Sequence, residues 1–315
     1  MPEENIQSQK LVAEHEIAGK KLDELKRNGV ALLGADFDGT VFDRTDPRYN
    51  LQQVIQLAYD VTSKKADFAL ISARNTTLEL TLRQEVVQFC RKRNTSFSLW
   101  RSGGNGMNLS KVTSSPEGVK VEPIYSHYLT LEDAQKSLEA YRSLHIDPDV
   151  PSQKFFQTFL QQDIPEDLVP KNFLALAKPY DGLVFGEAVK ISFVLPTAIK
   201  DQETCIESLR KSLEPHGLVV GWARMPFADI SKQSVVDGKL FAIQRVMEQL
   251  GVDGSHVGTF GDAPNDSDKG LVCLPYGFTN HQEVEKTDIN SPPFILDVKD
   301  SPVGTVHQAI QFLIQ

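Results

Sequence analysis

The sequence is poor in cysteine and in clustered positive charge. Its three cysteines, Cys90, Cys205 and Cys273, lie far apart and form no CxxC pair, which argues against a disulfide framework and against a zinc cluster. The net charge is −9 at pH 7 and no block of lysine or arginine stands out. A nucleic-acid partner is therefore not expected.

Long apolar runs are also missing. No run approaches the roughly 18 residues that a membrane-spanning helix needs, and the first residues lack the basic-then-apolar order of a signal peptide. We therefore expect a cytoplasmic protein that does not bind a membrane. What the chain does contain is 315 residues, 40% hydrophobic and 24% charged, enough for one large domain or two modest ones.

Two stretches of the chain show strand and helix patterns in alternation. The apolar run VALLGADF at 30–37 indicates a strand covered on both faces, and helix, strand, helix and strand patterns follow at 51–63, 68–71, 76–91 and 97–100. The alternation returns with a helix at 239–250, strands at 257–260 and 294–298, and a final helix at 303–314. This order predicts an α/β fold with a parallel sheet.

The segment between these stretches has a different order of helix and strand patterns and a different composition. It carries helix patterns at 131–144 and 202–213, strand patterns at 189–195 and 218–223, and connections rich in proline and glutamine. We interpret 106–232 as an α+β unit inserted into a core formed by 29–105 and 233–315. Loosely helical spacing of apolar residues within 1–28 predicts a helical leader ahead of that core.

Two carboxylates stand at the end of the first predicted strand. Asp36 and Asp38 lie where open α/β sheets place their ligand crevice, and side chains two apart on a strand share a face. Gly39 permits a sharp turn directly after them. Two neighbouring carboxylates repel unless a cation binds one and a proton the other, which would separate their chemical roles. Taken alone, an acidic turn after a strand explains these residues equally well.

Three further segments offer groups suited to phosphate or metal. Ser72 follows the second strand, where its hydroxyl and nearby N–H groups could hold a phosphate oxygen, and Lys239 begins a helix with an ammonium that can neutralise a phosphate. Asp262, Asn265 and Asp266 follow the strand at 257–260 and supply the oxygen ligands that Mg²⁺ prefers. Each segment alone is more commonly an ordinary turn or surface residue. Because all of them are predicted at strand or helix ends, together they favour a single site.

With these four segments in this order, the sequence resembles the haloacid dehalogenase-like superfamily. The motifs are matched by DFDGT at 36–40, Ser72, Lys239 and GDAPND at 261–266. The insertion between the second and third motifs resembles subclass IIB, whose large α/β cap is found in sucrose-phosphate phosphatases and Cof-type sugar phosphatases. The resemblance implies a Rossmann-like core with an inserted cap. The sequence departs from the pattern with Ser-Ala-Arg at 72–74, where Thr-Gly-Arg is usual.

The resemblance also implies roles for the matched residues. Asp36 would be the nucleophile, Asp38 the acid that protonates the leaving oxygen and then the base that activates water, and Lys239 the third catalytic group. Mg²⁺ would be held by Asp36, the Asp38 backbone carbonyl and Asp262, with support from Asn265 and Asp266. The candidates for binding substrate or phosphate are Thr40, Ser72, Arg74, Asn105, Lys190 and Lys239.

These inferences predict a magnesium-dependent phosphatase, a phosphoric monoester hydrolase that acts on a small phosphorylated metabolite such as a sugar phosphate through an aspartyl-phosphate. Two alternatives remain: a phosphomutase or phosphotransferase on the same core, and a non-catalytic binding protein. The presence of Asp36, Asp38, Lys239 and Asp262 disfavours the second of these. A phosphoprotein substrate stays open, although a large cap favours small molecules. A monomer is favoured.

Overall fold

A computed structural model of the chain describes residues 18–43, 45–72, 77–104, 106–127, 129–144, 190–196, 198–221, 227–232, 238–261, 272–274, 294–296 and 301–315. The chain divides into two compact units. The first comprises Met1–Ser72, Leu82–Ile124 and Asp237–Gln315, and the second Ala73–Thr81 and Tyr125–Val236. Within the described residues, every helix is too short or too polar to cross a membrane.

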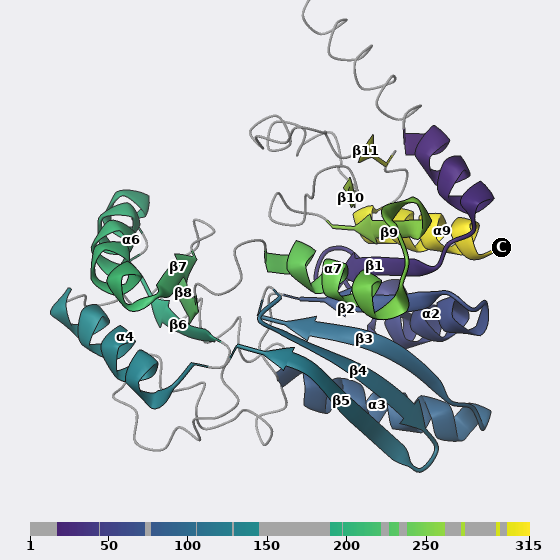
Figure 1. The fold of residues 1–315 in the computed structure, drawn as a ribbon, viewed down its shortest axis with the longest axis horizontal. Helices are drawn as coiled ribbons and strands as arrows, with labels where there is room; N and C mark the ends of the chain where they lie inside the picture. Colours follow the sequence, from purple (N-terminus) through teal and green to yellow (C-terminus); the bar gives the residue numbers. More distant parts are fainter. Residues whose placement is uncertain are drawn as a thin grey trace, which may run out of the picture. The chain divides into compact units, whose positions relative to one another are not determined.

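The first unit is built on a mostly parallel sheet (Figure 1). In the described part of the chain the sheet has eight strands in the order β11-β10-β9-β1-β2-β3-β4-β5. All neighbours from β11 to β3 run parallel, whereas β4 runs antiparallel to β3. The strands are β1 (Leu32–Asp36), β2 (Asp67–Ile71), β3 (Phe97–Gly103), β4 (Asn108–Ser115), β5 (Gly118–Ser126), β9 (Val257–Phe260), β10 (Val272–Leu274) and β11 (Phe294–Ile295).

Helices cover both faces of this sheet. Figure 1 shows α7 (Gly238–Leu250) on one face and α2 (Leu51–Ser63) with α9 (Pro302–Ile314) on the other, while α3 (Thr77–Arg93) joins β2 to β3. All five residues of β1 are buried, as expected for a central strand between two helix layers. The α/β class predicted from the sequence is confirmed.

Local signals in the sequence set the start of α2. The Asn50 side chain caps the helix by accepting hydrogen bonds from the N–H groups of Gln52 and Gln53. The helix then buries one face, made of Val54, Ile55, Leu57, Ala58 and Val61. The expected bounds of 51–63 are therefore confirmed.

The helix formed by residues 18–28 packs on the first unit. Leu25 lies against β9 at Gly258, where an added Cβ would stand 3.5 Å from the Leu25 Cδ1. The Lys26 ammonium lies 4.1 Å from the ring centroid of Phe312 on α9. The part of the predicted leader that the structure describes is therefore a layer of the core.

The second unit has its own small core. Its sheet, in the order β6-β8-β7, is antiparallel and consists of β6 (Lys190–Val194), β7 (Leu218–Gly221) and β8 (Phe227–Lys232). Helices α4 (Leu131–Ser143) and α6 (Ile199–Leu213) supply the other layer. Thr130 and Asp133 form a capping box at the start of α4, and Asp133 also pairs with Lys232 at 3.0 Å.

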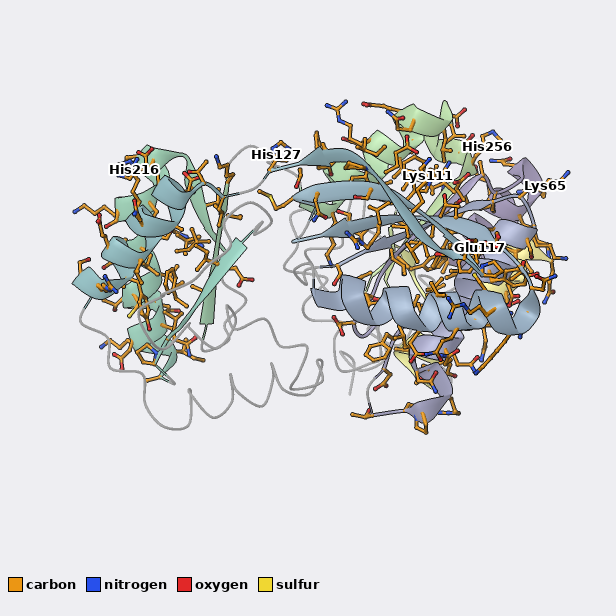
Figure 2. The ribbon with its side chains drawn as sticks, turned by 90° about the horizontal axis from the view of Figure 1, so that it is seen from below. Lys65, Lys111, Glu117, His127, His216 and His256 are labelled. Atoms are coloured by element: carbon orange, nitrogen blue, oxygen red, sulfur yellow. The ribbon has the colours of Figure 1, made fainter. Side chains whose placement is uncertain are left out.

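The inserted unit begins later than the sequence predicts. Residues 108–126, assigned above to the insertion, form β4 and β5 at one edge of the large sheet. The longer segment of the second unit starts at Tyr125, near the end of β5, instead of at residue 106. Figure 2 shows Glu117 at the turn between β4 and β5, and His127 beyond the far end of β5. The pattern was missed because buried positions of β4 are polar, including Asn108, Ser110 and Ser114.

Candidate active site

Asp36 ends β1 and the chain turns sharply behind it. Gly39 has a positive φ of 74°, its N–H donates to the Phe42 carbonyl at 3.0 Å, and the Phe42 N–H donates to the Phe37 carbonyl at 2.9 Å. These bonds hold Asp38, which is half-buried, beside the strand end. Asp36 is only 9% exposed and Thr40 is fully buried within the turn. The turn therefore fixes two carboxylates at one edge of the sheet.

Lys239 reaches this edge from the first turn of α7. Its Nζ lies 2.8 Å from the Asp36 Oδ1, and both side chains are about one-tenth exposed. A charge buried to this extent needs a partner, because the loss of solvation is offset only by a close opposite charge. The structure thus brings together the first and third predicted motifs, which lie far apart in the sequence.

The packing of α7 on β1 explains how this pair is placed. Gly34 and Asp36 share one face of β1, and Lys239 and Ile243 share one face of α7. Ile243 lies over Gly34, where an added Cβ would be 2.4 Å from the Ile243 Cδ1. Two residues of strand and one turn of helix both advance about 6 Å. Lys239 therefore stands over Asp36.

Ser72 occupies the adjacent strand end. Asp36 pairs with Ile71 in the register of β1 and β2, so Ser72 is the next residue at the same edge, and it is 3% exposed. Its N–H donates to the Ser102 carbonyl at 2.9 Å, so this N–H is engaged between neighbouring strand ends. The Ser102 Oγ is buried and has no hydrogen-bond partner among the described residues. The sequence gives no signal for Ser102 beyond its place ahead of Gly103-Gly104.

A histidine from α9 supports the turn behind Asp36. The His307 Nε2 lies 2.8 Å from the Val41 carbonyl, and the imidazole stacks at a tilt against Tyr49 with 5.1 Å between ring centroids. Burial lowers the pKa of His307, although the hydrogen bond to Val41 opposes this effect. We infer that the His307 imidazole is neutral and donates a hydrogen bond from Nε2 to the Val41 carbonyl. Sequence patterns missed His307 because the contact depends on tertiary packing.

Other predicted residues are not placed. Arg74, Asn105, Asp262, Asn265 and Asp266 lie outside the described residues. Lys190 begins β6 in the second unit, where its backbone alone is described.

The donor chemistry at the edge fits Mg²⁺ in part. Asp36 and Asp38 carry hard oxygen donors, and Ala35 pairs with Phe260, two residues before Asp262 in the chain. Within the described ranges, no cluster of three or more histidine, cysteine, aspartate or glutamate side chains forms a complete metal site. Asp36 and Asp38 are therefore two oxygen donors of the kind that Mg²⁺ prefers, short of a complete set among the described residues.

Comparison with known proteins gives matches at the level of structure. No protein-family model and no curated protein matches the sequence. A haloacid dehalogenase-like hydrolase from Bacteroides thetaiotaomicron matches with a TM-score of 0.61 and 16% identity, covering 90% of this chain and 98% of its own. A haloacid dehalogenase subclass IIB sugar phosphatase matches with a TM-score of 0.55 and 15% identity, over the same shares of the two chains.

A phosphatase of the same superfamily from Bacteroides thetaiotaomicron matches with a TM-score of 0.55 and 13% identity, covering 90% of this chain and 95% of its own. At these identities the likeness concerns the fold. The protein therefore has the fold of the haloacid dehalogenase-like hydrolases, the superfamily that its motifs resemble.

Proposed function

We propose that the protein is a magnesium-dependent phosphatase that hydrolyses a small phosphorylated metabolite, with sugar phosphates as the favoured class. The observation that carries the proposal is the buried pair between Asp36 and Lys239 at the carboxyl edge of the sheet. A carboxylate held there is a nucleophile, and an ammonium beside it can stabilise negative charge on a transferring phosphoryl group. A subclass IIB sugar phosphatase with the same fold supports the choice of substrate.

The proposed reaction has two steps. An Asp36 oxygen attacks phosphorus, the bond from phosphorus to the leaving oxygen breaks, and Asp38 gives its proton to that oxygen. Asp38 then takes a proton from water, the water oxygen attacks the phosphorus of the aspartyl-phosphate, and inorganic phosphate leaves with Asp36 restored. Ser72 and Lys239 hold phosphoryl oxygens in both steps.

Mg²⁺ would be held by Asp36, the Asp38 carbonyl and Asp262, with Asn265 and Asp266 behind them. When bound, it would shield the negative charge that the phosphate and the carboxylates share. Thr40, Arg74 and Asn105 are proposed to contact the phosphate or the substrate.

We further propose that the second unit acts as a cap that selects substrate and excludes water. Its insertion in the chain between Ser72 and Lys239 supports this role. Lys190 on β6 is a candidate contact for the substrate.

Mass spectrometry of an acid-quenched reaction tests the chemistry. Purified protein is mixed with Mg²⁺ and a panel of hexose phosphates, and free phosphate and phosphorylated peptides are measured. We expect free phosphate as product and a transient phosphate on Asp36. Asp36→Asn should lower kcat on the order of 10⁴-fold, while Asp23→Asn, on the exposed face of helix 18–28, should leave it unchanged.

Two outcomes would contradict the proposal. An active Asp36→Asn variant would exclude Asp36 as nucleophile. Transfer of the phosphate to a second sugar, without release of inorganic phosphate, would identify a phosphotransferase.

A further inference from the structure

Two glycines outside the matched motifs make unusually close backbone contacts with α7. An added Cβ at Gly106 would lie 2.0 Å from the carbonyl oxygen of Gly238 and 3.3 Å from the backbone nitrogen of Lys239. One turn further along α7, an added Cβ at Gly34 would lie 2.4 Å from the Ile243 Cδ1. Real Cβ atoms essentially never approach a neighbour to 2.0 or 2.4 Å, so a side chain at either position would force the neighbouring atoms to move.

The two contacts differ in how easily the obstructing atoms could move. At Gly34 the nearest obstructing atom is the Ile243 Cδ1, the end of a flexible side chain, which can turn aside, and the Thr259 Cγ2 on β9 comes next at 3.0 Å. At Gly106 the obstructing atoms belong to the backbone of the first turn of α7, which can yield only if the helix end moves. Gly106 also has a φ of 90° and Gly238 a φ of 51°. At both positions the backbone therefore has a positive φ, which favours glycine.

Lys239 stands between these contacts, next to Gly238 in the chain and one turn before Ile243. We propose that Gly106 and Gly34 form a seat for α7 and are positioning residues for Lys239. In this seat Gly106 fixes the start of the helix along the sheet edge, and Gly34 fixes its height above β1. Together they hold the Lys239 Nζ within 2.8 Å of Asp36. The catalytic consequence rests on the proposed function, but the placement of Lys239 does not.

The chemical reactivity of Lys239 reports its placement without reference to activity. An ammonium that is one-tenth exposed and paired with a carboxylate should acylate slowly with an amine-directed reagent, whereas the half-exposed Lys21 should react quickly. Acylation rates of individual lysines are measured by peptide mass spectrometry on the full chain. In Gly106→Ala we expect Lys239 to react at least threefold faster, with Lys21 unchanged.

A matched control separates this effect from backbone strain. Gly29 has a φ of 82°, close to that of Gly106, but an added Cβ at Gly29 would meet nothing within 4 Å. Gly29→Ala therefore carries a similar conformational cost without displacing α7, and should lower the Tm by about 2–6 °C. Its Lys239 reactivity and its kcat should match those of the unaltered protein.

A second variant keeps the test decisive if Gly106→Ala does not fold. Gly34→Ala should raise the reactivity of Lys239 less than Gly106→Ala. Adding Ile243→Val removes the Cδ1, which is the nearest obstruction and the one that belongs to α7, and should bring the reactivity back toward the original value. Rescue by a smaller partner is expected of a steric seat and not of general destabilisation.

Turnover provides the second readout. With a hexose phosphate as substrate, Gly106→Ala should lower kcat at least tenfold with KM changed less than threefold, because the phosphoryl group loses its ammonium during transfer. Unchanged Lys239 reactivity in folded Gly106→Ala and Gly34→Ala variants would overturn the seat. Raised reactivity in a protein without phosphatase activity would instead contradict the proposed function and leave the seat standing.

Discussion

The buried pair between Asp36 and Lys239 predicts a strong energetic coupling. At a separation of 2.8 Å, two unit charges attract by about 6 kcal/mol if the effective dielectric constant is about 20. Desolvation of the two groups offsets part of this attraction. We therefore expect a net coupling of about 2–4 kcal/mol in the free energy of unfolding.

A double-mutant cycle measures this coupling. Asp36→Asn and Lys239→Met keep the size of each side chain and remove its charge, and the double variant removes both. Urea unfolding is followed in the presence of a chelator, so that bound metal does not contribute. The coupling is the departure of the double variant from the sum of the two single variants, whatever the sign of each single effect.

The helix of residues 18–28 offers a control pair. Lys21 and Glu24 approach to 3.2 Å, but both side chains are about half exposed, and the corresponding cycle should give a coupling of at most about 0.5 kcal/mol. If the effects of Asp36→Asn and Lys239→Met add to within about 0.5 kcal/mol, the reasoning from burial and distance is wrong.

Three further predictions concern pH, the second unit and the metal. The pKa of His307 is lowered from its usual value of 6.5, so below that pH the unfolded chain binds more protons and the free energy of unfolding should fall. His307→Gln, which keeps a donor for Val41, should flatten this fall in urea titrations between pH 7 and pH 5, and an unaltered slope would count against it. Asp133→Asn removes the carboxylate shared by the cap of α4 and Lys232, and should destabilise the second unit by about 1–2 kcal/mol in calorimetry, more than Glu132→Gln on the same turn. Chelation should abolish turnover and added Mg²⁺ should restore it, whereas full activity after thorough chelation would exclude the proposed cofactor.

Elements with strong local patterns were predictable from the sequence. The bounds of α2 follow from a capping asparagine and an apolar face. The strand predicted at 257–260 matches β9, whose four residues are all buried. Strand β4 lacks such a pattern, because Ser110 and Ser114 occupy buried positions. Its partner β5 lies at the sheet edge with mixed burial and carries Pro123, so alternation is weak there too.

The residue types of the candidate site could be predicted from the sequence, but the packing contacts that hold them could not. The type and order of Asp36, Ser72 and Lys239 pointed to phosphoryl transfer, and the structure places the first and last in contact. The close approaches of Gly34 and Gly106 to α7 were not predictable, because a glycine in sequence does not reveal which neighbour requires it. Only the packed backbone identifies the atoms that a side chain would displace.

The strand order has a consequence for the order of folding. Strand β1 pairs with β2, which follows it closely in the chain, and with β9, which is synthesised only after the whole second unit. Until β9 is synthesised, β1 has one edge paired with β2 and one open edge, along which Leu32 and Leu33 later pair with Val257 and Gly258. A nascent chain that ends before residue 257 would expose a hydrophobic pairing edge to other chains. Arrival of α7 and β9 would close that edge and bring Lys239 to Asp36, so that the buried ion pair forms as the exposed strand edge is covered.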